Sequence, residues 1–306
     1  MRRSPLASRR TVLAGLTAGA LAAAFPARAA PAILRKPIPS TGESVPAIGM
    51  GSWLTFDVGS DEAARAQRTE VLRAFFDMGG AVIDSSPMYG SSQDVIGDAL
   101  ARLGRPAALF AADKVWTPGG EDGAKQIERS RTRWGVERFD LLEVHNLVDW
   151  RRHLEKLFQV KAEGRLRYVG VTTYAGLRHA EVEAIIQNHP IDFVQLTYNV
   201  LDREAENRLL PAAREKGVAV IANRPFREGA LFPIFSGRKL PPIAAGIGAA
   251  SWAQFMLKFI ISHPALTVAI PATRRVGHMR ENMGALAGPA PDAGQRAEML
   301  RSLTEL

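Results

Sequence analysis

The 306-residue chain contains no cysteine, which excludes disulfides, thiolate metal ligands and a cysteine nucleophile. It also has no Gly-x-Gly-x-x-Gly motif after its first predicted strand, which argues against a Rossmann fold. An apolar run at residues 11–25 is too short to cross a hydrocarbon core of ~30 Å comfortably. What remains, 46% hydrophobic and 23% charged residues, is typical of a globular protein.

Residues 1–29 have the pattern of a cleavable export signal. A basic start is followed by the apolar run and by Ala27-Arg28-Ala29, which fits a small-x-small cleavage site. The pair Arg9-Arg10, with Val12 two positions on, resembles a twin-arginine signal. An ordinary secretory signal is the alternative. We therefore expect the export machinery to deliver a mature chain, starting at Ala30, to the periplasm, with no stable insertion in the membrane.

The formal net charge of +8 is largely a property of this signal. Residues 1–29 carry five arginines and no acid, so the net charge of the mature chain falls to +3. This modest value indicates no nucleic-acid partner.

Beyond a proline-rich lead-in, short apolar segments alternate with helical patterns. The spacing predicts strands at residues 47–50, 81–83, 107–112, 139–144, 168–171, 192–196, 218–222 and 267–270. The helices between and after them are predicted at residues 61–78, 93–103, 123–134, 150–163, 177–188, 205–216, 249–262 and 277–286, with a last one at 295–303. Continuously apolar strands indicate a sheet buried on both faces. Eight such units predict a single-domain (β/α)₈ TIM barrel over residues 30–306.

Four polar side chains fall at the same end of successive predicted strands. Asp84 follows the second strand, Tyr89 lies in the loop after it, Lys114 follows the third and His145 the fourth. The C-terminal ends of barrel strands converge on one mouth, so these groups are expected to meet. Taken singly, each has an ordinary alternative: a turn cap, a packed ring, a surface lysine and a core histidine.

Together these groups have the chemistry for protonating a carbonyl oxygen. A phenol has a pKa near 10, and Lys114, held by Asp84, would stabilise the phenolate of Tyr89 and make it a proton donor. His145 would bind and orient the substrate oxygen. Because the chain contains no hydride source, a nicotinamide cofactor is implied.

Several stretches resemble the aldo-keto reductase family across roughly residues 34–290. They are Ile83-Asp84-Ser85-Ser86-Pro87-Met88-Tyr89-Gly90, Asp113-Lys114-Val115-Trp116, Asp140-Leu141-Leu142-Glu143-Val144-His145-Asn146, Tyr168-Val169-Gly170-Val171-Thr172, Phe193-Val194-Gln195-Leu196-Thr197-Tyr198-Asn199, Ile270-Pro271-Ala272-Thr273-Arg274-Arg275 and Arg280-Glu281-Asn282. The resemblance implies that Tyr89 is the general acid, that Asp84 and Lys114 tune it, and that His145 polarises the carbonyl.

The resemblance also implies NADPH (NADP in its oxidised form), extended across the barrel mouth. The residues it assigns to the cofactor are Thr172, Thr173 and Gln195 at the carboxamide, Asn223 and Arg224 near the ring, and Thr273, Arg274, Arg275, His278, Glu281 and Asn282 at the adenosine phosphate. The chain departs from the family at four positions. Thr173 replaces a frequent Asn, Asn223 an aromatic residue, Ala272 a frequent Lys and His278 a common Arg.

Trp53, Met88, Trp116 and the loop 226–242 predict an apolar pocket for a small-molecule carbonyl substrate. The sequence thus predicts an exported, NADPH-dependent oxidoreductase that reduces an aldehyde or ketone to an alcohol. One alternative is an exported NADP-binding or sensor protein with little catalysis. Another is a metal-dependent hydrolase on the same barrel, which would need several histidines and carboxylates at strand ends, whereas only His145 among six histidines ends a strand.

Overall fold

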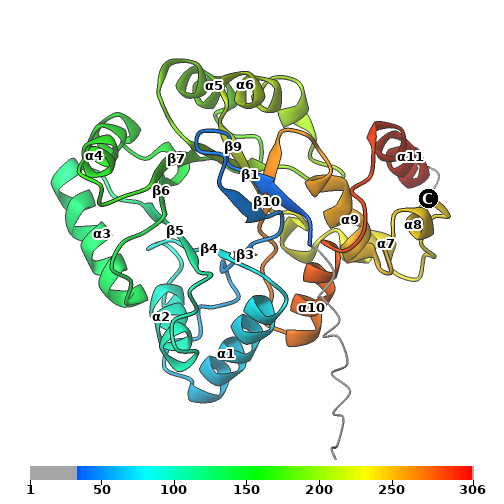
Figure 1. The fold of residues 1–306 in the computed structure, drawn as a ribbon, viewed down its shortest axis with the longest axis horizontal. Coiled ribbons are helices and arrows are strands. Elements are labelled where there is room, and N and C mark those ends of the chain that lie inside the picture. The colour runs from blue at the N-terminus through cyan, green and yellow to red at the C-terminus, as the bar shows by residue number, and fades with distance from the viewer. Residues whose placement is uncertain (1–32, 305–306) are drawn as a thin grey trace, which may run out of the picture. The chain divides into compact units, whose positions relative to one another are not determined.

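Eight parallel strands form the centre of the molecule. The computed structural model describes residues 33–304, so the predicted signal at residues 1–29 lies outside the described residues. In chain order the strands are β3 (Met50–Gly51), β4 (Val82–Asp84), β5 (Phe110–Val115), β6 (Leu141–Val144), β7 (Tyr168–Thr172), β8 (Phe193–Thr197), β9 (Ala219–Asn223) and β10 (Leu266–Ala269). Each pairs with its sequence neighbour, and parallel bridges from Ile48 to Ala269 and from Gly51 to Ala272 join the first strand to the last (Figure 1). The predicted (β/α)₈ barrel is confirmed.

The barrel closes at β3, where glycines leave no side chain between this strand and its neighbours. A Cβ at Gly51 would lie 2.8 Å from the carbonyl oxygen of Ile270, and one at Gly49 would lie 2.8 Å from that of Val82. Both distances are too short for a real side-chain atom, so glycine allows β3 to approach both of its neighbours.

Helices surround the barrel (Figure 1). They are α1 (Glu62–Asp77), α2 (Ser92–Arg102), α3 (Gly120–Trp134), α4 (Trp150–Ala162), α5 (His179–Asn188), α6 (Leu209–Lys216), α9 (Trp252–Ile261) and α10 (Val276–Gly284), followed by α11 (Ala293–Thr304). The side chain of Asp61 caps α1 by accepting the N–H of Ala64 at 3.0 Å. Gly135 ends α3 in the left-handed conformation, with φ 62°. Within residues 33–304, no helix combines the length and the apolar character needed to cross a membrane.

One helix prediction and one loop prediction differ from the structure. The predicted helix 205–216 is split into a 3₁₀ turn, Glu204–Glu206, and α6, because Arg208 adopts a non-helical φ of −141°. The loop 226–242 contains the short helix α7 (Phe232–Phe235), and α8 (Ile243–Gly246) follows it. Ser91 occupies the N-cap position of α2, but its hydroxyl donates to Asp57 instead of capping the helix.

A hairpin of β1 (Arg35–Pro37) and β2 (Ser44–Pro46) lies across the N-terminal end of the barrel (Figure 1). Ile38 and Val45 pack against the apolar side chains inside the ring. The hydroxyl of Tyr168, at the start of β7, lies 2.8 Å from the hydroxyl of Thr41 in the hairpin turn. This end of the barrel is therefore closed, which leaves the C-terminal end as the mouth.

Every second side chain along a strand points into the barrel, and these inward side chains form an apolar layer with a polar layer next to it. The apolar layer, nearer the N-terminal end of the barrel, includes Val82, Ala112, Leu141, Phe193 and Ile221. Two residues further along the same strands come Asp84, Lys114, Glu143, Gln195 and Asn223, which we call the polar layer. Successive strand residues point to opposite faces, so this shift by two keeps the polar groups inside the ring, at its C-terminal end.

Two of these residues were predicted to lie just after their strands, and these predictions are wrong. Asp84 is the last residue of β4, and Lys114 is the fifth of six residues in β5. The strand predicted at 107–112 was ended early because Asp113 and Lys114 are polar, although both are fully buried here. Burial of a charged pair cannot be recognised from an apolar run alone.

Candidate active site

Lys114 and Asp84 form a buried ion pair in the polar layer. Lys114 Nζ donates to both carboxylate oxygens of Asp84 at 2.6 Å and to the carbonyl oxygen of Ser85 at 2.9 Å. The side chains are 0% and 2% exposed. Burial alone would lower the pKa of Lys114, but Asp84 and other nearby acidic groups raise it above its ordinary value. The ammonium group is therefore charged at neutral pH.

The phenol of Tyr89 lies beside this cation. Its ring centroid is 5.5 Å from Lys114 Nζ, 4.9 Å from the ring of Trp53 and 5.6 Å from that of His145. Burial raises the pKa of Tyr89 to about 12, and Lys114 opposes this effect without cancelling it. The prediction that Lys114 makes the phenol more acidic therefore needs correcting: its effect has the expected sign, but burial is larger.

His145 is held by a neighbour that the sequence analysis did not single out, Ser86. His145 Nδ1 lies 2.8 Å from Ser86 Oγ, which also accepts the N–H of Met88 at 3.2 Å. Because Ser86 Oγ accepts the N–H of Met88, its hydroxyl hydrogen can be donated to His145 Nδ1. This arrangement favours the tautomer of His145 that carries its proton on Nε2. Burial and the nearby Lys114 lower the pKa of His145 well below its ordinary value, so the ring is neutral at pH 7.

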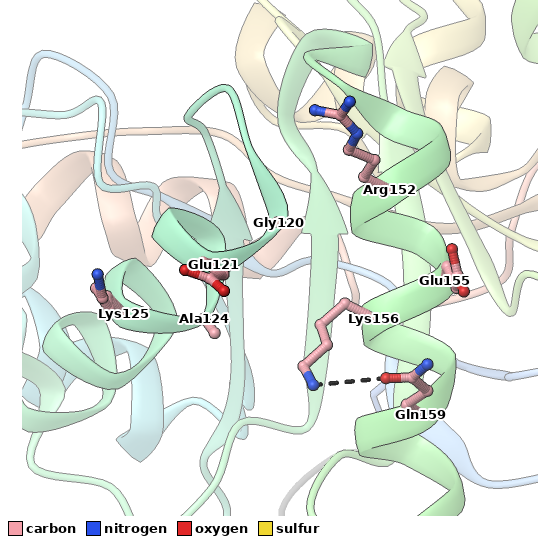
Figure 2. Close-up of a pocket in the computed structure, with 8 residues that line it drawn as sticks. All are labelled: Gly120, Glu121, Ala124, Lys125, Arg152, Glu155, Lys156 and Gln159. Atoms are coloured by element: carbon pink, nitrogen blue, oxygen red, sulfur yellow. Dashed lines mark hydrogen bonds between the residues drawn. The ribbon is translucent and has the colours of Figure 1, made fainter.

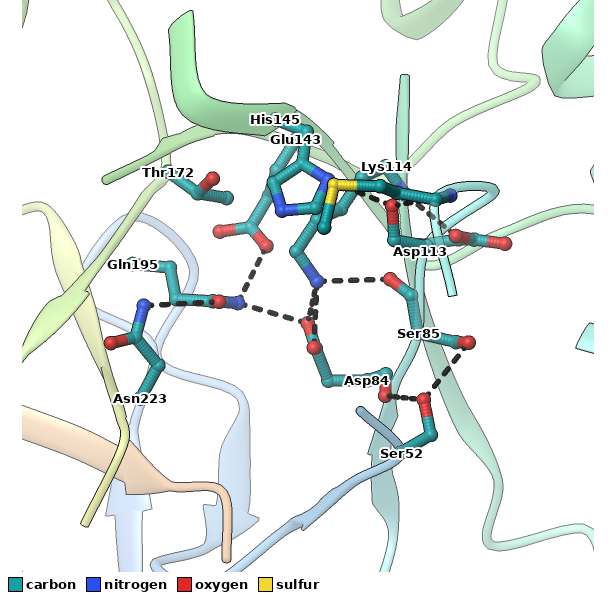
Figure 3. Close-up of polar contacts among 12 residues, drawn as sticks. Ser52, Asp84, Ser85, Asp113, Lys114, Glu143, His145, Thr172, Gln195 and Asn223 are labelled. Carbon is teal, nitrogen blue, oxygen red and sulfur yellow. Dashed lines mark hydrogen bonds and ion pairs between the residues drawn. The ribbon is translucent and has the colours of Figure 1, made fainter. Parts of the chain in front are cut away.

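Gln195 connects two acids in the polar layer (Figure 3). Its Nε2 donates to Asp84 Oδ1 at 2.9 Å and to Glu143 Oε2 at 3.0 Å. Glu143 is completely buried, and burial raises its pKa well above the ordinary value. Glu143 is a residue of this site that was not among the predicted ones. The available signal was its position, two residues after the inward-facing Leu141 and two before His145.

Of the residues assigned to the nicotinamide carboxamide, Thr172 and Thr173 lie at the end of β7 and Gln195 lies in the middle of β8, while Asn223, assigned near the ring, ends β9. Asn223 Nδ2 donates to the carbonyl oxygen of Thr173 at 2.9 Å, and Thr197 Oγ1 donates to Asn223 Oδ1 at 2.7 Å. Thr172 accepts the N–H of Asn146 at 2.9 Å. Through Gln195 this group is continuous with Asp84, so the structure brings it together with the predicted tetrad.

The residues assigned to the adenosine phosphate follow β10. Thr273 Oγ1 accepts the N–H of Arg275 at 3.1 Å, and Arg275 immediately precedes α10. The others lie around the start of α10 or along it: Arg274 and His278 are exposed, Glu281 is half-buried and Asn282 is buried. Arg224, in contrast, lies after β9 and pairs with Glu228. Exposed arginines at the N-terminus of a helix make a suitable phosphate site.

Large apolar side chains surround the mouth. Within residues 33–304, the exposed ones all lie in segments that follow the C-terminal ends of strands: Trp53, Leu54, Trp116, Tyr174, Leu177, Leu201, Phe232 and Ile234. We call this set the apolar rim. Met88, in the same loop as Tyr89, is half-buried. The predicted wall residues Trp53, Met88 and Trp116 are thus all placed in loops at the mouth.

A groove on the surface lies away from the mouth. Figure 2 shows a groove between α3 and α4 on the outside of the barrel, lined by Gly120, Glu121, Ala124, Lys125, Arg152, Glu155, Lys156 and Gln159. It contains none of the predicted site residues. Among the residues the structure describes, no three His, Asp or Glu side chains are grouped to hold a metal ion. That part of the chain therefore offers nothing in favour of the hydrolase alternative.

The fold and this site define a family. The model of the aldo/keto reductase family matches residues 47–294, and the chain belongs to that family. A similar curated protein is methylglyoxal reductase YeaE of Escherichia coli K12, 27% identical over 79% of this chain and 86% of the relative. Aldo-keto reductase str7 of Strobilurus tenacellus is 29% identical over 72% of this chain and 76% of the relative.

Solved structures of aldo-keto reductases are also similar to this chain. The thermostable aldo-keto reductase Tm1743, in complex with the inhibitor epalrestat, is 29% identical, has a TM-score of 0.74 and is matched over 89% of this chain and 100% of its own. An aldo/keto reductase of Klebsiella pneumoniae, in complex with NADP and acetate, is 25% identical with a TM-score of 0.72, over 86% of this chain and 93% of its own. The predicted family is therefore confirmed along nearly the whole barrel.

Proposed function

We propose that this protein is an NADPH-dependent reductase that converts an aldehyde or ketone to an alcohol. The observation that carries the proposal is the meeting of Tyr89, His145 and the Lys114–Asp84 pair at one mouth. Membership of the aldo/keto reductase family and the NADP complex of the Klebsiella pneumoniae relative support it.

The residues around the mouth fit the cofactor. Gln195 Nε2 is held by Asp84 and Glu143, so the hydroxyl groups of Thr172 and Thr173 and the amide oxygen of Gln195 are the groups that suit a carboxamide. Arg274 and Arg275 stand at the start of a helix that suits a phosphate. When bound, NADPH would supply the hydride for the carbonyl carbon.

The chain's own part is to hold the substrate and to move one proton. His145, neutral and with a proton on Nε2, donates a hydrogen bond to the carbonyl oxygen and fixes its position. Tyr89 then gives its phenolic proton to that oxygen as the C=O bond becomes C–O. Its raised pKa keeps the proton in place at neutral pH, and the transfer remains favourable because an alkoxide is a stronger base than a phenolate. Lys114 stabilises the phenolate that remains.

The apolar rim supports a carbonyl compound with an apolar or aromatic body as the substrate. Trp53 packs directly on Tyr89, so an aromatic surface borders the reacting carbonyl. One relative is a methylglyoxal reductase, whose substrate is small. Rates of NADPH oxidation with carbonyl compounds of increasing apolar size would distinguish a substrate with an apolar or aromatic body from a small one.

The activity is tested with the mature chain, residues 30–306, and its Tyr89→Phe variant. Both should quench tryptophan fluorescence on binding NADPH, since the phenolic oxygen is not needed for binding. The variant should lose about 10²–10⁴-fold in kcat for carbonyl-dependent NADPH oxidation, the usual contribution of a general acid. Tyr168→Phe, at the closed end of the barrel, is the control and should keep its activity.

Two outcomes would contradict the proposal. Binding of NADPH without turnover of any carbonyl compound would favour the second candidate, an exported NADP-binding or sensor protein. Absence of nicotinamide binding would overturn both. The second candidate is weakened by the complete set of Asp84, Tyr89, Lys114 and His145, which a binding protein has no need to keep.

We further propose that the signal at residues 1–29 is of the twin-arginine type and that the protein acts in the periplasm. Twin-arginine export carries folded proteins, so the cofactor would enter the barrel before export. The absence of cysteine suits an oxidising compartment.

A further inference from the structure

The polar layer contains two acids and one cation, and the N–H donors of the cation are all used without the second acid. An ammonium group has three N–H donors. Those of Lys114 go to the two carboxylate oxygens of Asp84 and to the carbonyl oxygen of Ser85. None is left for Glu143, although Glu143 lies opposite Lys114 in the register of β5 and β6.

The structure makes room for the buried side chain of Glu143. On the neighbouring strand β7, a Cβ at Gly170 would lie 3.1 Å from Glu143 Cγ and 2.7 Å from the carbonyl oxygen of Phe193. Glu143 Oε2 accepts from Gln195, whereas Oε1 has no hydrogen-bond partner within residues 33–304. Figure 3 shows the carboxyl group between Thr172 and Gln195. An anion without an ion-pair partner in such a place is costly, so the geometry favours the neutral acid.

We propose that Glu143 is a positioning residue for the reductase reaction: as a neutral acid it holds the Gln195 amide and leaves the positive charge of Lys114 to act on Tyr89, and its ionisation as pH rises weakens Tyr89 as an acid. The inference rests on the function proposed above. It assigns to Glu143 no contact with the substrate.

The charges around Glu143 determine the sign of the pH effect. It faces Lys114 from β5 and Asp84 from β4, while β7 and β8 contribute the uncharged Gly170, Thr172 and Gln195. Burial raises the pKa of Glu143, Lys114 lowers it and Asp84 raises it. Glu143 is therefore neutral below this raised pKa and anionic above it. The anion raises the pKa of Tyr89 further, so carbonyl reduction should decline as pH rises through the pKa of Glu143.

The first test is the pH profile of kcat for carbonyl reduction. Glu143→Gln keeps the shape and the acceptor for Gln195 but cannot ionise, so its alkaline decline should move up by about one pH unit or more. Glu143→Leu also cannot ionise and should show the same shift, but it loses the acceptor for Gln195 and should raise the KM for NADPH. Asp192→Asn, which changes a buried acid just before β8, is the matched control and should keep the wild-type profile.

The second test does not depend on activity. The infrared difference spectrum of wild type minus Glu143→Gln, without cofactor, should contain a protonated-carboxyl band at neutral pH that disappears at alkaline pH. A carboxylate signal at neutral pH, or identical pH profiles for wild type and Glu143→Gln, would overturn the inference. A wild-type protein without reductase activity would instead overturn the proposed function, and the infrared band would still decide the ionisation state of Glu143.

Discussion

At the scale of single residues, the Lys114–Asp84 pair bears on both the stability of the fold and the proposed chemistry. The two side chains are almost completely buried, and their charges compensate each other. The pair places a fixed positive charge beside Tyr89, 5.5 Å from its ring centroid. Ser86 has a comparable supporting role, since it orients the imidazole of His145.

Removing one partner of this pair should destabilise the fold. Lys114→Met leaves Asp84 as a buried, uncompensated carboxylate, and we expect a loss of about 3–5 kcal/mol in the free energy of unfolding. Urea denaturation at pH 7 measures it.

The matched control is the double variant Lys114→Met with Asp84→Asn. It removes both charges together and should be less destabilised than Lys114→Met alone. A double variant that is as unstable as the sum of both single variants would show that the two side chains do not act as a pair.

At the scale of elements, α2 determines where Tyr89 lies. The helix begins at Ser92, three residues after Tyr89, and packs against α3. The two helices approach closely at Gly97, where a Cβ would lie 1.9 Å from the carbonyl oxygen of Arg133. Glycine at this position thus allows α2 to sit close enough to hold the loop that carries the phenol.

Gly97→Ala should therefore force α2 away from α3. We expect a destabilisation of about 1–3 kcal/mol, typical of overpacking, together with a fall in kcat because the loop before α2 shifts. Gly246→Ala in α8 is the control, since a Cβ there meets nothing within 4 Å. Equal unfolding free energies for both variants would contradict the inferred packing constraint.

At the scale of the whole molecule, the proposed location depends on the N-terminal signal. Replacing Arg9 and Arg10 by lysine should stop export, because twin-arginine transport reads this pair. Full-length protein should then accumulate in the cytoplasm, as cell fractionation would show. The wild-type protein should be recovered from the periplasm with Ala30 as its first residue.

Arg2→Lys with Arg3→Lys keeps the same total charge and serves as the control for the export experiment. It should leave export intact, since it lies outside the recognised pair. Continued export of the Arg9→Lys, Arg10→Lys variant would indicate an ordinary secretory signal instead.

The local sequence determined much of this protein. Eight apolar segments separated by helical patterns were enough to predict the barrel, because strands buried on both faces and helices with one apolar face have different periodicities. The order of Asp84, Tyr89, Lys114 and His145 along the chain predicted that these four groups meet at one mouth, since parallel strands bring their C-terminal ends together. Asp61 as the cap of α1 likewise follows from local chemistry.

Only the tertiary structure decided which polar groups are buried and what they contact. Glu143 looks like an ordinary acid in the sequence, and its role depends on the space beside Gly170 and on the saturation of Lys114 by Asp84 and Ser85. The pKa of Tyr89 depends on the balance between burial and a nearby cation. These are properties of distances between strands, which a single sequence does not contain, because desolvation and Coulomb energies arise only when the barrel closes.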